Sequence, residues 1–249
     1  MGEYSNVHAT LAEGLRKLGH EVTVLSNGDF WKNYPRDINM VRKPGKLGGI
    51  LYLIKLYTIV HKLRGYDIVQ LINPMFLELK AERIFPIYRY LRKHNRKVVL
   101  GAFGMDYYWV SVCCQDKPLR YSDFNIGDDL RTNADALKER KDWLGTAKER
   151  LNRMIAEDCD GIIAGLYEYW VCYQPHFPQK TTFIPYPIHT YSQSYQDRNK
   201  GASSVDIPKR PSQKLKLFIG INKTRSEYKG TDIMLKAAQA IAEKYPEKV

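Results

Sequence analysis

Two basic residues late in the sequence have the spacing of a phosphate-binding loop. A predicted strand over residues 214–220 is followed by Arg225, and then by Lys229 and Gly230 at the start of a predicted helix. The first turn of a helix presents unpaired N–H groups and a partial positive charge, so it attracts anions. A lysine adds a point charge, and an arginine adds two parallel donors. The pattern predicts a diphosphate site at these three residues; the alternative is a pair of solvated loop charges.

Charge stabilisation at such a loop suits a reaction in which a phosphate group leaves. A nucleoside diphosphate gains negative charge as its bond to a transferred group breaks, and donors that meet this charge stabilise the transition state. Such donors substitute for a divalent metal. The four cysteines show no CxxC or Cys/His spacing, which predicts reduced, mostly buried thiols. We therefore expect neither a metal nor a cofactor.

Alternating strands and helices predict an α/β fold with a mainly parallel sheet. Short runs of β-branched residues indicate strands, and the segments between them have helical spacing. The predicted strands are 21–25, 67–72, 97–101, 161–164 and 181–184, and the predicted helices are 5–18, 47–63, 78–93 with an interruption at Pro86, 131–157 with a break at Gly145, and a short aromatic helix that ends at Tyr173. Residues 104–130 are predicted to form a loop. In such folds ligands bind at the carboxyl ends of the strands.

A polar segment divides the sequence into two predicted domains. Residues 188–213 are rich in Ser, Gln, Pro and charge and almost free of aliphatic side chains, which is typical of a linker. Residues 1–187 then form a first domain, and residues 214–249 form the first βα unit of a second. The first domain opens with a loop and a helix where a strand is usual. We expect this chain to lack that strand and most of the second domain.

The composition limits the partners of the protein. A net charge of +12 favours polyanionic partners such as nucleic acid, an anionic membrane or phosphorylated ligands. The sequence has no run of five Lys or Arg residues and no helix-turn-helix, RNA-recognition or zinc-finger pattern, so nucleic acid is not an expected partner. With no signal peptide and no apolar run long enough to span a bilayer, we expect a cytoplasmic protein.

Five segments carry a resemblance to a known family, and they occur in the family's order. The segments are 14–24 (GLRKLGHEVTV), 66–74 (YDIVQLINP), 159–165 (CDGIIAG), 183–188 (FIPYPI) and 220–235 (GINKTRSEYKGTDIML). Together they resemble the retaining GT-B glycosyltransferases of family 4, also called glycosyltransferase group 1. The resemblance implies two Rossmann-like domains. It also implies a hexosyltransferase-like enzyme of polysaccharide biosynthesis, which moves a sugar from a nucleotide sugar to a hydroxyl of a glycan or lipid-linked acceptor.

The sequence departs from this family in two places. The loop from Gly220 to Lys229 is longer than the family's G-R-x-x-x-x-K-G, so either Lys223 or Arg225 takes the role of the arginine. The acidic pair that the family places further along its second domain, in contact with the sugar and the ribose, is not in this chain. We therefore expect the chain by itself to be weakly active or inactive.

The resemblance assigns contacts to the loop at the N-terminus. In the family, the backbone amides of this loop approach the donor diphosphate or the acceptor. This implies a diphosphate contact for Gly2 and acceptor contacts for Ser5 and Asn6. The alternative is a helix cap at Ser5 or Asn6, and both roles are compatible. His8 is interpreted as a residue of the helix surface.

The loop after the strand at 97–101 lies where the family has a segment in contact with the acceptor. Gly104 is an expected acceptor contact, and Asp106 is the expected catalytic carboxylate, which orients or deprotonates the acceptor hydroxyl. The alternative for Asp106 is a turn aspartate. The three aromatic residues that follow it are expected to pack rather than to stack on a sugar.

The segment 42–64 joins an apolar helix to basic flanks. The basic residues are Arg42, Lys43, Lys46, Lys55, Lys62 and Arg64. Such a segment can dock on an anionic membrane, as in enzymes with lipid-linked acceptors. The preferred alternative is a core helix with a basic rim.

Two rival functions remain open from the sequence. The first is a non-catalytic α/β protein that binds polyanions or nucleic acid, which requires Lys and Arg to be concentrated on one face. The second is a sugar-nucleotide epimerase of the GT-B type, which fits the linker and the Lys-Gly loop less well.

Overall fold

The computed structural model describes residues 1–189, 218–220 and 230–248. These residues belong to two compact units, Met1–Ile188 and His189–Val249, and each unit is described by itself. Most of the predicted linker and of the strand at 214–220 lies outside the described residues. The second unit contains the predicted helix, α10 (Thr231–Lys244).

The first unit is a parallel α/β domain. Its described strands are β1 (Leu25–Ser26), β2 (Ile38–Asn39), β3 (Ile68–Leu71), β4 (Lys97–Ala102), β5 (Asn125–Ile126), β6 (Asp129–Leu130), β7 (Gly161–Ala164) and β8 (Thr181–Phe183). Its described α-helices are α1 (Val7–Lys17), α2 (Gly45–Ile59), α3 (Ala81–His94), α4 (Tyr107–Gln115), α5 (Ala134–Trp143), α6 (Ala147–Asp158) and α7 (Tyr167–Tyr173). Single 3₁₀ turns occur at η1 (Phe30–Lys32) and η2 (Val60–Lys62).

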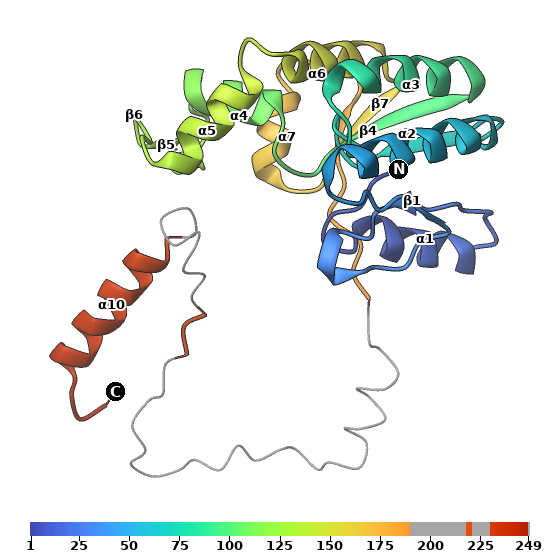
Figure 1. The fold of residues 1–249 in the computed structure, drawn as a ribbon. Coiled ribbons are helices and arrows are strands. Elements are labelled where there is room, and N and C mark those ends of the chain that lie inside the picture. Colours follow the sequence, from blue (N-terminus) through green and yellow to red (C-terminus); the bar gives the residue numbers. More distant parts are fainter. Residues whose placement is uncertain (190–217, 221–229, 249) are drawn as a thin grey trace, which may run out of the picture. The chain divides into compact units, whose positions relative to one another are not determined.

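The central sheet has four parallel strands in the order β3-β4-β7-β8. Helices α3 and α6 lie above β4 and β7 in Figure 1, and α1 lies beside β1 below them. Val98, Leu100 and Ala102 of β4 are fully buried, as expected for a strand covered on both faces. The architecture is compatible with a Rossmann-like domain.

Residues 1 and 2 join the central sheet to a smaller parallel sheet formed by β1 and β2. The Gly2 N–H donates to the carbonyl of Leu25 at 2.8 Å, and the Ile72 N–H donates to the carbonyl of Met1 at 2.8 Å. The amino group of Met1 also donates to the carbonyl of Gln70. Residues 1–2 therefore occupy the position between β1 and β3, which is where the sequence pattern lacks a strand.

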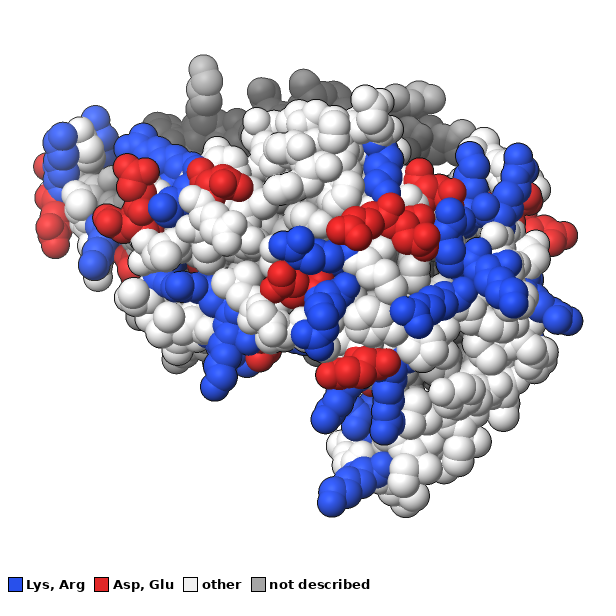
Figure 2. Space-filling model, turned by 90° about the horizontal axis from the view of Figure 1, so that it is seen from above, with Lys and Arg blue, Asp and Glu red and all other residues white. Residues whose placement is uncertain are grey.

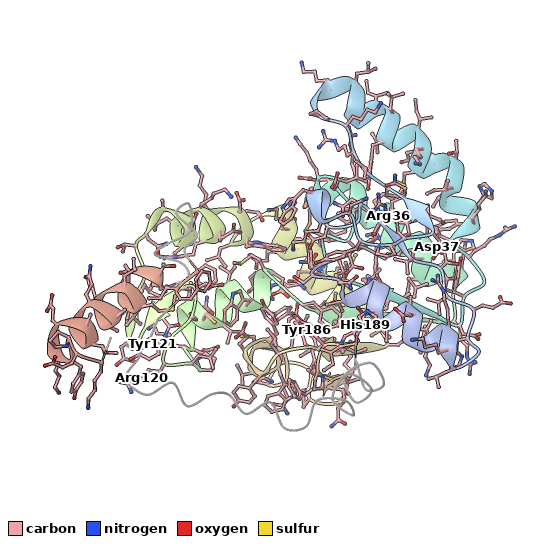
Figure 3. All side chains as sticks on the ribbon, turned by 90° about the horizontal axis from the view of Figure 1, so that it is seen from below. Arg36, Asp37, Arg120, Tyr121, Tyr186 and His189 are labelled. Carbon is pink, nitrogen blue, oxygen red and sulfur yellow. The ribbon has the colours of Figure 1, made fainter. Side chains whose placement is uncertain are left out.

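A short ion pair ties the smaller sheet to α1. Asp37, which precedes β2 and is labelled in Figure 3, accepts hydrogen bonds from the Arg16 guanidinium at 2.6 Å and from the Val24 N–H at 2.6 Å. The observed strand β1 is shorter than the strand predicted over 21–25, because only Leu25 and Ser26 pair with β2.

The prediction of a loop over residues 104–130 is wrong, because this segment contains α4 and the hairpin of β5 and β6. Helix α4 is buried from Tyr107 to Cys113, so it shows no polar face by which to recognise it. The predicted break at Gly145 is confirmed: this residue has φ 71° and separates α5 from α6. The predicted interruption at Pro86 is not seen, since α3 continues through it with Ile84 and Ile87 buried on either side.

The approach of β4 to β3 requires a glycine at position 101. A Cβ on Gly101 would lie 2.7 Å from the carbonyl oxygen of Leu71 and 2.7 Å from the ring of Phe103. We predict that Gly101→Ala lowers the free energy of unfolding by about 1–3 kcal/mol, because the strand must shift to relieve the overlap. Urea unfolding measures this change.

Gly104→Ala is the matched control. A Cβ at Gly104 would meet nothing closer than the Tyr4 ring at 3.5 Å, which is an ordinary contact, so its effect should stay within about 0.5 kcal/mol. Equal stability of the two variants would contradict this account of the β3–β4 packing.

Candidate functional site

A pocket of about 240 Å³ lies at the carboxyl ends of β1 and β3, beside residues 2–4. The residues that line it are Gly2, Glu3, Tyr4, Leu25, Ser26, Asn27, Phe30, Met40, Tyr52, Ile72, Met75, Phe76, Leu77, Glu78 and Leu79. The direction of strand addition reverses here, since β1 and β2 lie on one side of residues 1–2 and β3, β4, β7 and β8 lie on the other. Open α/β sheets bind their ligands at such a switch point.

A carboxylate, an amide and a phenol meet at this pocket. The Asn27 side-chain amide donates to the Glu78 carboxylate, and its oxygen accepts from the Asp29 N–H at 3.0 Å. The Tyr52 hydroxyl accepts from the Glu78 N–H at 3.3 Å, and burial raises the pKa of this phenol to about 12. The phenol therefore stays protonated and can donate to a ligand, while the carboxylate accepts.

One aromatic side chain at the pocket remains exposed. Phe30 lines the pocket with 66% of its surface exposed, and it has a φ of 58°, a left-handed conformation that costs a bulky residue energy. Neighbouring Asp29 and Asn33 are left-handed as well. Local strain that presents an apolar ring to solvent is typical of a binding segment.

Among the described residues that line the pocket, none is Lys or Arg. The first turn of α1 does not supply the missing positive charge. The buried Glu3 carboxylate accepts hydrogen bonds from the N–H groups of His8 at 3.1 Å and Ala9 at 2.8 Å, and desolvation raises its pKa. The chain's own carboxylate thus fills the place that a phosphate takes at a helix N-terminus.

Because the Glu3 carboxylate occupies the first turn of α1, the expected ligand contacts of Gly2, Ser5 and Asn6 find no support there. Gly2 lines the pocket, but a Cβ there would lie 2.3 Å from the Ile72 side chain and φ is +82°, so packing alone explains this glycine. The Ser5 N–H donates to Asp29 at 2.9 Å. Asn6 takes the cap position of α1 without a side-chain hydrogen bond. The side chain that caps the helix is Glu3, which the sequence did not indicate.

His8 is buried, in contrast to the helix-surface position expected from the sequence. Its Nδ1 lies 2.7 Å from the carbonyl oxygen of Gly2, and its ring meets Phe103 edge to face. Burial lowers the pKa of this imidazole to about 3, so the ring is neutral and Nδ1 donates to the carbonyl. The spacing to Leu11 and Ala12, which follow on the same helix face, is the sequence signal that could have revealed this burial.

Asp106, the expected catalytic carboxylate, is fully buried and caps α4. One oxygen accepts from the Trp109 N–H at 2.9 Å and the other accepts from the Tyr173 hydroxyl at 2.7 Å. Desolvation raises the pKa of this carboxyl to about 6. A carboxylate without exposure cannot reach an acceptor, so the geometry favours the alternative of a structural aspartate. Gly104 lies nearby against the Tyr4 ring.

The aromatic residues around the carboxyl edge pack as expected. Tyr107, Tyr108 and Trp109 are buried. Tyr186, labelled in Figure 3, folds back from β8 so that its hydroxyl donates to the Phe103 carbonyl at 3.3 Å. A Cβ on Gly165 would lie 1.9 Å from the Tyr186 ring, so this close contact requires the glycine.

The basic loop that carries Lys223, Arg225 and Lys229 lies outside the described residues, so its diphosphate contact stays a prediction. Gly230 is described: it has φ 63° and directly precedes α10, which begins at Thr231 as expected. Within the described ranges there is no group of three His, Cys, Asp or Glu side chains that could hold a metal ion.

No protein-family model, curated protein or solved structure matches this chain. The site is therefore defined by its position at the switch point and by the side chains that line it.

The burial of Asp106 makes the stability of the domain depend on pH. The carboxyl keeps its proton up to about pH 6 in the folded state and loses it near pH 3.8 in the unfolded state. The contribution of this carboxyl to the free energy of unfolding is fully present below about pH 3.8. It is lost as the pH rises through about pH 6. Relative to Asp106→Asn, the wild type should lose on the order of 2–3 kcal/mol between about pH 4 and pH 6.

Denaturant titrations of both proteins across this pH range measure the difference. Because every other titrating group is shared, a difference that stays constant with pH would show that Asp106 is not desolvated in the way described here.

Proposed function

We propose that this protein transfers a sugar from a nucleotide-sugar donor to a hydroxyl of a glycan or lipid-linked acceptor, with retention of the anomeric configuration. The observation that supports this proposal best is the pocket at the switch point of a parallel α/β sheet. The resemblance of five ordered segments to retaining GT-B glycosyltransferases gives the chemistry that such a pocket would serve.

The side chains of the pocket fit a neutral ligand rich in hydroxyl groups. Glu78 accepts and Tyr52 donates hydrogen bonds, and sugars offer both kinds of group. The exposed ring of Phe30 offers an apolar face for a sugar ring. A phosphate fits poorly, because two carboxylates and no cation line the pocket. We therefore assign the pocket to the acceptor.

The donor diphosphate then needs a second site, and the basic loop of 223–229 is the candidate. Lys229 with either Lys223 or Arg225 would meet the charge that develops on the leaving nucleoside diphosphate, without a metal. Glu78 takes over from Asp106 as the carboxylate that orients the acceptor hydroxyl, because it lines the pocket whereas Asp106 is sealed in the core.

The rival polyanion-binding function requires a protein surface on which Lys and Arg are concentrated. On the face shown in Figure 2, Asp and Glu side chains lie among the Lys and Arg side chains. This view gives no support to a continuous basic surface of the kind that binds nucleic acid.

Loss of the lysine at the predicted diphosphate loop should impair the reaction. In the full gene product, we expect Lys229→Ala to lower kcat/KM for the nucleotide sugar on the order of 100-fold. The variant removes one hydrogen-bond donor to the leaving diphosphate. Release of nucleoside diphosphate from a panel of uridine and guanosine diphosphate sugars measures this value. Lys236→Ala, at an exposed position of α10, is the control and should be neutral. Absence of any nucleotide-sugar turnover or binding would refute the proposal.

The aromatic side chain at the pocket should affect the acceptor and not the donor. We predict that Phe30→Ala raises the KM for the acceptor about fivefold, because a stacking surface is lost, and leaves the KM for the donor unchanged. Tyr121→Ala removes a similarly exposed ring that does not line the pocket, and it should change neither value. A donor KM that rises in Phe30→Ala would assign the pocket to the nucleotide instead.

A further inference from the structure

Helix α2 carries an apolar stripe on its outer side. Leu47, Ile50, Leu51, Ile54 and Tyr57 each have at least 50% of their surface exposed. At 3.6 residues per turn, positions with these spacings of three and four share one face of a helix. The stripe is therefore continuous over about three turns, whereas the exposed apolar residues common on protein surfaces are scattered singly.

The opposite side of the same helix is part of the core. Tyr52 and Leu56 are 3% and 0% exposed, and Gly48 lies so close to the Lys43 carbonyl that a Cβ would approach it to 2.0 Å. Helix α2 is thus fixed on the domain by its inner face. Figure 3 shows it at the periphery of the first unit, in light blue at the upper right.

Positive charges border the stripe. Lys46 and Lys55 lie on its two flanks by helical position, and further exposed cations stand at its ends: Arg42, Lys43, Lys62 and Arg64. The sequence contains no Asp or Glu between Asp37 and Asp67. In Figure 2 the lower right part of the molecule, where α2 lies, presents uncharged surface bordered mostly by Lys and Arg, with one group of Asp or Glu side chains at its upper border.

We infer that the outer face of α2 docks on an anionic phospholipid bilayer. The apolar stripe enters the boundary between headgroups and acyl chains, and the six bordering cations meet the headgroup phosphates. A second copy of this chain is a poorer occupant, because a symmetric contact through α2 would bring two sets of cations together without any acidic residue between them. Among the described residues, no helix is long and apolar enough to cross a bilayer.

The inferred docking does not depend on the proposed sugar transfer. It does bear on the acceptor, because Tyr52 on the inner face of α2 lines the pocket while the outer face meets the lipid. A lipid-linked acceptor could thus reach the pocket from the membrane beside α2.

Cosedimentation with vesicles tests the docking. We expect the protein to bind vesicles of phosphatidylcholine mixed with phosphatidylglycerol and to bind pure phosphatidylcholine far more weakly. The charge variant Lys46→Gln with Lys55→Gln should lower the partition coefficient on the order of 30-fold, and the apolar variant Ile50→Ser with Ile54→Ser should lower it on the order of tenfold.

Matched variants elsewhere on the domain control for charge and apolarity. Lys93→Gln with Lys141→Gln removes the same charge, and Leu18→Ser with Leu137→Ser removes two exposed apolar side chains outside α2; both should bind as the wild type does. Thermal unfolding checks that every variant is folded. No binding to the anionic vesicles, equal loss in the control variants, or a dimer that dissociates in Ile50→Ser with Ile54→Ser while vesicle binding is absent would each overturn the inference.

Discussion

The backbone hydrogen bonds of the first two residues hold the two sheets of the domain together. Gly2 donates to Leu25 of β1, and Met1 accepts from Ile72 just beyond β3, so one short segment joins the two parallel sheets. Each sheet is parallel within itself, and the residues that follow β1 and β3 line one pocket. Its walls depend on this junction, which also explains the need for a glycine at position 2.

The junction determines which charges the pocket can accommodate. Directly after it, Glu3 turns inward and occupies the first turn of α1, so the helix end that usually attracts a phosphate is already neutralised. The remaining polar groups are a carboxylate, an amide and a phenol. Under the proposed function, a phosphorylated donor would therefore find its cations elsewhere, and the basic loop of 223–229 is where the sequence offers them. The proposed division of labour between the two parts of the chain follows from this separation of charge.

The sequence predicted the elements whose signals are local. Runs of β-branched residues located β3, β4, β7 and β8 to within a residue or two at each end, and Gly145 marked the break between α5 and α6. Helix α4 was missed because tertiary packing buries it on most sides, so no amphipathic period is present. The site was less predictable, since the exposure of a carboxylate depends on partners far away in the chain. Asp106 is sealed by Tyr173, and Glu78 meets Asn27 across 51 residues.

The central claim is that the pocket binds a hydroxyl-bearing acceptor and excludes phosphate. Backbone amide shifts of the isotope-labelled protein test it most directly, with short oligosaccharides and free nucleoside diphosphates added separately. The account predicts that the saccharides shift the amides of Ser26, Asn27 and Glu78 and that the diphosphates leave these amides unchanged. Shifts of the same amides on addition of a nucleoside diphosphate, with none from any saccharide, would contradict it.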